Sequence, residues 1–222
     1  MRVEWHGQSA FALTGEKAKV FIDPFADMSG LVDRGVSWEY PAIDVGEVDL
    51  LLITHEHVDH NGVEAIEGEP AVLRSTAGRL ESPIGEVLAI ASEHDQAAGT
   101  ERGPNTIFAF DLDDVRVAHF GDFGQSELRP EQAAALEGTE LLFLPVGGGP
   151  TIGASAAAAI VEALAPRWVV PMHYRTQRIG FLETEEEFVA QMPRVEKLPE
   201  SGFDSAELPG GDGPLVVAPA AP

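Results

Sequence analysis

The chain has 222 residues, of which 44% are apolar and 23% are charged, as in an ordinary globular domain with a sizeable core. It contains no cysteine, which excludes disulfides, thiolate metal ligands and a cysteine nucleophile, so any metal ion must be held by His, Asp and Glu. The formal net charge of −23 works against binding of a polyanion, because nucleic-acid binding depends on basic residues that contact phosphates.

The first half of the chain is predicted to consist mainly of strands. The run Leu50–Ile53 is apolar without interruption, which is typical of a strand buried on both faces. The other strands predicted in this half are Val3–Trp5, Ser9–Leu13, Lys19–Ile22, Ala71–Leu73, Glu86–Ile90, Thr106–Phe110 and Val115–Phe120.

The second half mixes strands with helices. Leu141–Leu144 and Trp168–Val170 are predicted strands, and a helix is expected from Pro130 to just before Gly138. A second helix is expected over Ile152–Ala165, where apolar residues recur every four positions, and a third after the capping-box pattern of Thr184 and Glu187. This order predicts an α/β protein whose sheets are covered by helices.

Residues 1–198 are expected to form one domain, and residues 199–222 an acidic, Pro- and Gly-rich tail with one edge strand at Leu215-Val216-Val217. No stretch is long and apolar enough to cross a bilayer, and Met1–Trp5 lacks the apolar core of a secretion signal. We therefore expect a cytoplasmic protein. The acidic, lysine-poor composition also fits a high-salt habitat.

The segment from Thr54 to Gly62 contains a cluster of candidate metal ligands. It follows the buried strand directly, and it contains three of the seven histidines: His55, His57 and His60, together with Asp59. Imidazole and carboxylate are the ligands that zinc takes when thiolate is absent. The two-residue step from His55 to His57 puts both rings on one side of an extended chain, while Asp59 and His60 can face a second ion.

This segment resembles the HxHxDH signature of the metallo-β-lactamase superfamily, and later motifs of that superfamily follow in order. Their candidate residues are His94 in Ser92-Glu93-His94-Asp95, Asp122 in His119-Phe120-Gly121-Asp122 and His173 in Pro171-Met172-His173-Tyr174. The resemblance implies a four-layer αββα sandwich.

A narrower resemblance is to the small metal-dependent hydrolases related to L-ascorbate 6-phosphate lactonases. It depends on Leu144–Gly148, on Val170–Tyr174 and on the opening Trp5–Phe11. Many members of that branch carry Gly-His-Ser where this chain has Gly7-Gln8-Ser9. The resemblance covers roughly residues 1–195 by motif order.

The resemblance implies one or two divalent metal ions, zinc or manganese first, with iron or nickel as alternatives. His55, His57 and His94 would hold the first ion, and Asp59, His60 and His173 the second, with Asp122 between them. A metal-bound hydroxide would attack a small-molecule lactone, ester or phosphoester. Asp122 and Asp59 are then the catalytic candidates, since Asp59 could also steer the nucleophile.

Five further residues have more than one interpretation each. Asp23, before Pro24, is either an orienter of a metal-binding imidazole or a turn residue. His6 either lines the pocket or lies in the first hairpin. His119 could be a ligand, but we favour a supporting role at the site or a place on a sheet face, because Asp122 already occupies the ligand position. Arg175 and Arg178 either contact an anionic substrate or are ordinary surface arginines.

The alternatives to a hydrolase are a non-catalytic metal-binding scaffold, a nuclease and a di-iron oxidoreductase. The complete ligand set disfavours the scaffold, and the negative charge disfavours the nuclease. Di-iron oxidoreductases of the flavodiiron type normally have a carboxylate in place of one metal-binding histidine, and this chain keeps all of these histidines. The expected partner is a small-molecule substrate, with no nucleic acid and no membrane, and a homo-oligomer stays open. The loops Asp27–Tyr40 and Thr176–Leu182 are expected to shape the pocket or a lid.

Overall fold

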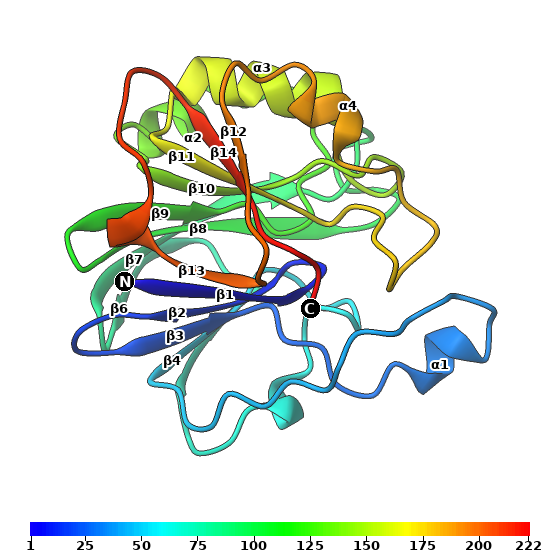
Figure 1. Cartoon of the computed structure of the whole chain (residues 1–222). Helices are drawn as coiled ribbons and strands as arrows, with labels where there is room; N and C mark the ends of the chain where they lie inside the picture. Colours follow the sequence, from blue (N-terminus) through cyan, green and yellow to red (C-terminus); the bar gives the residue numbers. More distant parts are fainter.

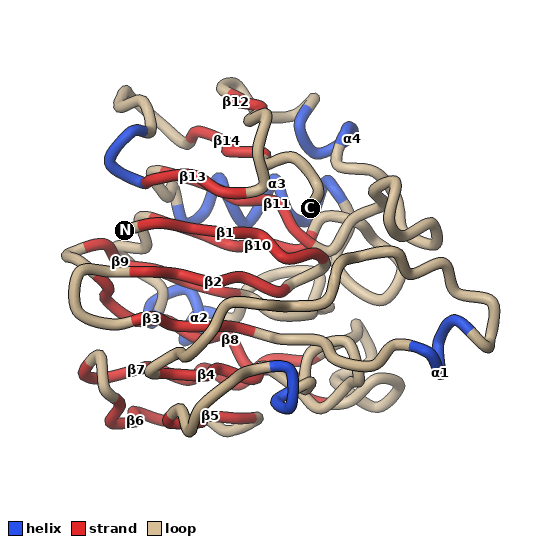
Figure 2. The backbone as a smooth tube through the Cα atoms, turned by 60° about the horizontal axis from the view of Figure 1, so that its bottom comes forward, coloured by secondary structure: helices blue, strands red, loops and turns tan.

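A computed structural model describes residues 1–222. Two β-sheets lie face to face and form the centre of the molecule (Figures 1 and 2). The six-stranded sheet has, in spatial order, β13 (Gly202–Asp204), β1 (Arg2–Gly7), β2 (Ala10–Thr14), β3 (Lys19–Ile22), β4 (Leu50–Ile53) and β5 (Ala71–Arg74). The eight-stranded sheet has β12 (Val195–Lys197), β14 (Leu215–Ala218), β11 (Trp168–Met172), β10 (Leu141–Pro145), β9 (Val115–His119), β8 (Pro104–Leu112), β7 (Gly85–Glu93) and β6 (Gly78–Ser82).

The main core lies between the sheets, because alternate residues of each strand point inward. It includes Trp5, Phe11, Phe108 and Phe143, and it belongs to a cluster of 41 buried residues that continues through the eight-stranded sheet to helical residues such as Ile160 on its outer side. Phe11 and Phe143 come from opposite sheets, and their ring centroids are 4.5 Å apart. This interdigitation fixes the distance between the sheets and thereby the positions of the loops at their edges.

The two outer layers differ. Helices α2 (Pro130–Ala135), α3 (Ala154–Leu164) and α4 (Glu186–Val189) belong to the half of the molecule that contains the eight-stranded sheet, and α3 lies across its outer side (Figure 1). The six-stranded sheet is covered mainly by loops, with the short α1 (Ser29–Val32) and a 3-10 turn at Val63–Ala65. A second cluster of 12 buried apolar residues lies under these loops. The α/β sandwich predicted from the sequence is confirmed, with one helical layer reduced to loops.

Parallel pairing places the functional loops at one edge. Strand β4 runs parallel to β3 and β5, and β10 runs parallel to β9 and β11. Because parallel strands end at the same edge of a sheet, the segments that follow β4, β9 and β11 are brought together there.

The C-terminal segment differs from its expectation as a tail with an edge strand. Strand β14 pairs with β11 on one side and β12 on the other, and β13 pairs with β1. All four residues of β14 are buried, so its apolar run is stabilised within the sheet rather than at its border. No helix has the length and apolarity that a membrane crossing requires, and the longest, α3, has 11 residues.

Candidate metal centre

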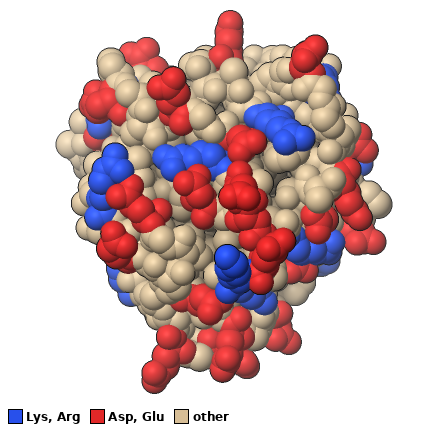
Figure 3. Space-filling model, turned by 90° about the vertical axis from the view of Figure 1, so that its left-hand side faces the viewer, with Lys and Arg blue, Asp and Glu red and all other residues tan.

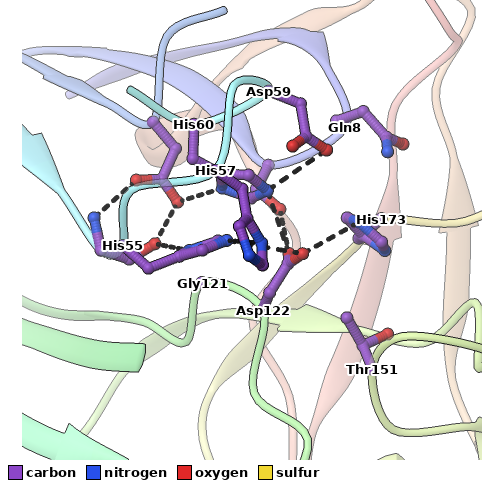
Figure 4. A network of polar contacts seen from close by, with 12 residues as sticks. Gln8, His55, His57, Asp59, His60, Gly121, Asp122, Thr151 and His173 are labelled. Atoms are coloured by element: carbon purple, nitrogen blue, oxygen red, sulfur yellow. Dashed lines mark hydrogen bonds and ion pairs between the residues drawn. The ribbon is translucent and has the colours of Figure 1, made fainter. Parts of the chain in front are cut away.

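The predicted ligands converge at one end of the sandwich. His55 and His57 lie just after β4, His94 just after β7, Asp122 after β9 and His173 after β11. Figure 4 shows the side chains of His55, His57, His60, Asp122 and His173 gathered there. Their donor atoms form three overlapping groups within 4.8 Å: His55 with His57 and His94; His55 with His60 and Asp122; and Asp59 with His60 and His173. The structure therefore brings together all seven residues that the sequence nominated as ligands.

Asp122 lies at the centre of this cluster. Its Oδ2 is 3.1 Å from Nε2 of His94 and 3.2 Å from Nε2 of His173, and its Oδ1 is 3.3 Å from Nε2 of His60. Ser9 also donates a hydrogen bond to Oδ1, at 3.4 Å. One carboxylate thus faces imidazoles from both halves of the centre: the first half is the group His55, His57 and His94, and the second is the group Asp59, His60 and His173.

Three of the imidazoles are held by their Nδ1 atoms. His60 donates to Asp23 Oδ2 (2.9 Å), and His94 donates to the main-chain oxygen of Pro150 (3.0 Å). Thr54 donates its hydroxyl hydrogen to Asp23, so its oxygen accepts from Nδ1 of His55 at 3.0 Å. These contacts fix the tautomer and leave Nε2 of each ring for a metal ion.

The electrostatics of the centre favour a cation. Burial holds the pKa of His55 well below its ordinary value, and the neighbouring His60 lowers it further. Burial opposes protonation of His60 as well, but the carboxylates of Asp122, Asp59 and Asp23 outweigh it and raise the pKa of His60 well above 6.5. Burial opposes ionisation of Asp122, yet His173 and His60 hold the pKa of that carboxyl well below its usual range. A positive charge is therefore stabilised among these side chains.

The residues fit a divalent metal ion. Nε2 of His60 is buried and has no hydrogen-bond partner, although it faces the carboxylates of Asp122 and Asp59. Nitrogen and carboxylate donors at this spacing suit zinc, manganese, iron or nickel. His57 is exposed and Asp59 is half-buried, so the centre opens to solvent on their side.

Three residues at the centre have left-handed backbone conformations that side chains rarely adopt: Gln8 (φ 48°), Asp23 (φ 50°) and His173 (φ 50°). Backbone strain of this kind concentrates at functional sites. Neither Gln8 nor Thr54 was given a role at the site from the sequence. Two signals were available for them: both lie at the ends of predicted strands, and Gln8 stands where many relatives have the histidine of Gly-His-Ser.

The remaining candidates lie around the centre. His119 donates from Nε2 to the main-chain oxygen of Ser9 (2.9 Å) and accepts from the Gly121 N–H (3.2 Å), so it supports the Asp122 loop and is not a ligand. Burial lowers the pKa of His119 and of His6. The His6 ring packs 5.3 Å from that of Phe21, outside the three ligand groups.

The two predicted pocket loops contact each other. The Tyr40 hydroxyl lies 3.0 Å from Oγ1 of Thr176, and the Glu39 N–H donates to the main-chain oxygen of Arg178 (2.9 Å). Arg178 Nε donates to the main-chain oxygen of Pro222 (2.8 Å), and Arg175 Nε donates to that of Leu182. Both arginines therefore stabilise the main chain of this region.

Comparison with known proteins identifies the family. Residues 2–173 match the family described as the β-lactamase superfamily domain. A UPF0173 metal-dependent hydrolase of Thermococcus kodakarensis is 31% identical over 207 residues, which covers 79% of this chain and 85% of the relative. A UPF0173 protein of Pyrococcus furiosus is 30% identical, covering 79% of this chain and 84% of the relative.

Solved structures share the fold. A Thermotoga maritima protein provisionally described as a Zn-dependent hydrolase of the metallo-β-lactamase superfamily aligns with a TM-score of 0.76, at 23% identity and 98% coverage of both chains. An isothiocyanate hydrolase from Delia radicum gut bacteria aligns with a TM-score of 0.64, at 15% identity, over 86% of this chain and 91% of its own. The narrower relationship to the ascorbate lactonase branch stays a prediction. The chain belongs to the metallo-β-lactamase superfamily, among relatives that are named metal-dependent hydrolases.

Proposed function

We propose that the chain hydrolyses a small-molecule lactone, ester or phosphoester with one or two divalent metal ions, zinc or manganese before iron or nickel. The observation that carries this proposal is the position of Asp122. Its carboxylate lies within 3.3 Å of imidazoles from three separate segments, which is the arrangement a carboxylate between two ions requires.

A bound divalent ion supplies Lewis acidity and makes water a nucleophile near neutral pH. The side chains of this centre would hold the ion and orient the water molecule. His55, His57 and His94 provide three nitrogen donors on one side of Asp122, and Asp59, His60 and His173 provide the donors on the other side. Asp59 is half-buried at the open side, where it can accept a proton from the attacking water.

Three observations support a small neutral substrate. The arginines that follow His173, Arg175 and Arg178, already donate to main-chain carbonyls, so we rank lactones and esters before phosphoesters. Figure 3 shows a face on which acidic side chains are interspersed with basic ones, without a basic patch for nucleic acid. The net charge of −23 also disfavours a nucleic-acid substrate.

The test combines metal analysis with a substrate screen. We expect protein purified without chelator to contain close to two ions per chain by mass spectrometry. The same preparation should hydrolyse at least one member of a panel of lactones, esters and phosphoesters, while Asp122→Ala should not. Protein that takes up neither zinc nor manganese, or that carries two ions and hydrolyses no member of the panel, would favour a metal-binding scaffold instead.

A further inference from the structure

The Gln8 side chain has no role in the centre described so far. It is fully buried, yet neither Oε1 nor Nε2 of its amide has a hydrogen-bond partner. Buried polar atoms in proteins are almost always paired, and an unpaired amide is costly. A residue with an apolar side chain would fold more easily at this position, so the amide requires an explanation.

The unpartnered atoms of the molecule gather at one place. Six buried side-chain atoms lack a partner, and four of them belong to Gln8, His60 and His173. His60 and His173 are members of the group that also contains Asp59. Figure 4 shows Gln8 on the same side of the centre as Asp59 and His173, with its amide end on the side of His173.

The backbone around Gln8 fixes the direction of this side chain. Its main-chain oxygen accepts from the N–H of His173 at 3.3 Å and from Nε1 of Trp5 at 3.0 Å. Both Gln8 and His173 are in the left-handed region, with φ of 48° and 50°. Two strained residues are thus bonded to each other, and both present side chains to the second half of the centre.

We propose that the amide oxygen of Gln8 is an additional ligand of the ion held by Asp59, His60 and His173. This inference rests on the metal centre of the proposed function and concerns which ion each half takes. Apart from the shared carboxylate of Asp122, the first half, with His55, His57 and His94, offers nitrogen donors only. The second half then has carboxylate and amide oxygens beside its imidazoles, and oxygen donors favour harder ions such as manganese over zinc.

The experiment measures metal affinity without any substrate. Protein that carries one equivalent of zinc is titrated with manganese, and free manganese is counted by electron paramagnetic resonance. A parallel titration with zinc uses a competing fluorescent chelator. Gln8→Leu should weaken binding of the second manganese ion by about tenfold or more and binding of the second zinc ion by less.

Three further variants test whether the donor atom at position 8 sets the metal preference. Gln8→Glu keeps an oxygen donor in the same shape and should bind the second manganese ion at least as tightly as the wild type. Gln8→His offers a nitrogen donor and should shift the preference toward zinc. Gln132→Leu removes another buried amide, whose hydrogen-bond partners are Ala91, Gln125 and Arg129 and not a predicted ligand, and should leave both affinities unchanged.

Two outcomes would overturn the assignment. Unchanged affinities in Gln8→Leu would show that the amide does not contact the ion. An equal loss for manganese and zinc, with no shift in Gln8→His, would assign Gln8 a purely structural role. If Gln8→Leu fails to fold, the Gln8→Glu and Gln8→His pair still decides the point. Because no substrate is involved, a protein without hydrolytic activity can still bind its second ion through Gln8, which separates the two proposals.

Discussion

Asp23 allows a quantitative test of how the centre is held together. It is fully buried, and its two oxygens accept three hydrogen bonds: from the Thr54 N–H (2.8 Å), from the Thr54 hydroxyl (2.7 Å) and from Nδ1 of His60 (2.9 Å). Every one of these contacts needs an acceptor. The substitution Asp23→Asn keeps the shape and tolerates the left-handed backbone, but replaces one acceptor with an NH₂ donor.

The loss of metal affinity expected in Asp23→Asn follows from the hydrogen bonds that the new NH₂ group would meet. If the new NH₂ faces His60, that ring can keep a hydrogen bond only by moving its proton to Nε2, the atom that faces Asp122 at 3.3 Å. If the NH₂ faces the Thr54 N–H instead, two buried donors oppose each other. In the first orientation a metal ion at Nε2 forces the proton back to Nδ1, where it faces the NH₂ group, and this unpaired donor costs about 1–3 kcal/mol of binding free energy. In the second orientation the same cost falls on the stability of the fold. We therefore expect metal affinity to fall by about 10- to 100-fold, the range typical of such supporting residues.

The assay is competition with a chromophoric chelator for zinc, at fixed pH and ionic strength. Asp113→Asn is the matched control, because Asp113 also has a positive φ (51°) and accepts from a backbone N–H, that of Glu16, at an exposed turn. The control should bind zinc as the wild type does. Wild-type affinity in Asp23→Asn would refute the idea that Asp23 fixes the tautomer of His60.

Three further substitutions test other parts of the site. Asp122→Ala should reduce bound metal from close to two ions per chain to below one, by mass spectrometry, with an unchanged far-ultraviolet circular dichroism spectrum. His119→Ala removes a fully buried ring and two hydrogen bonds, so urea denaturation should show a loss of about 3 kcal/mol in the free energy of unfolding. Gly147→Ala would place a Cβ 2.2 Å from the main-chain oxygen of His173 and should destabilise the fold by about 2 kcal/mol, whereas Gly180→Ala, with nothing within 4 Å, should be neutral in thermal unfolding.

The ligands of the centre could be predicted because their chemical type and their position after strands are both visible in the sequence. Leu50–Ile53 is apolar at every position and ends at a histidine-rich loop, and the observed strand β4 has the same bounds. The later ligands His94, Asp122 and His173 follow strands in the same way. Parallel pairing around β4, β9 and β11 then brings the segments after these strands to one edge, where His94 joins them from the end of β7.

The supporting contacts could not be predicted, since they depend on the path of the chain and not on residue type. His94 is held by the main-chain oxygen of Pro150, which any residue could supply. Gln8 is directed by a left-handed turn that its own sequence does not demand, because a glutamine there is strained. For the same reason, the apolar run of β14 gave no sign that two parallel neighbours, β11 and β12, would enclose it.

The number of carboxylates in the centre bears on how many divalent ions it would hold. Asp23, Asp59 and Asp122 bring three negative charges into a mostly buried site, and no arginine or lysine forms an ion pair with any of them. One divalent ion leaves this group net negative, which would repel an anionic oxygen. Two divalent ions beside Asp23, Asp59 and Asp122 would leave one net positive charge, which would favour a single developing negative charge on a substrate oxygen. The surplus of carboxylates over fixed cations therefore favours two bound ions over one, which the metal analysis proposed above would test.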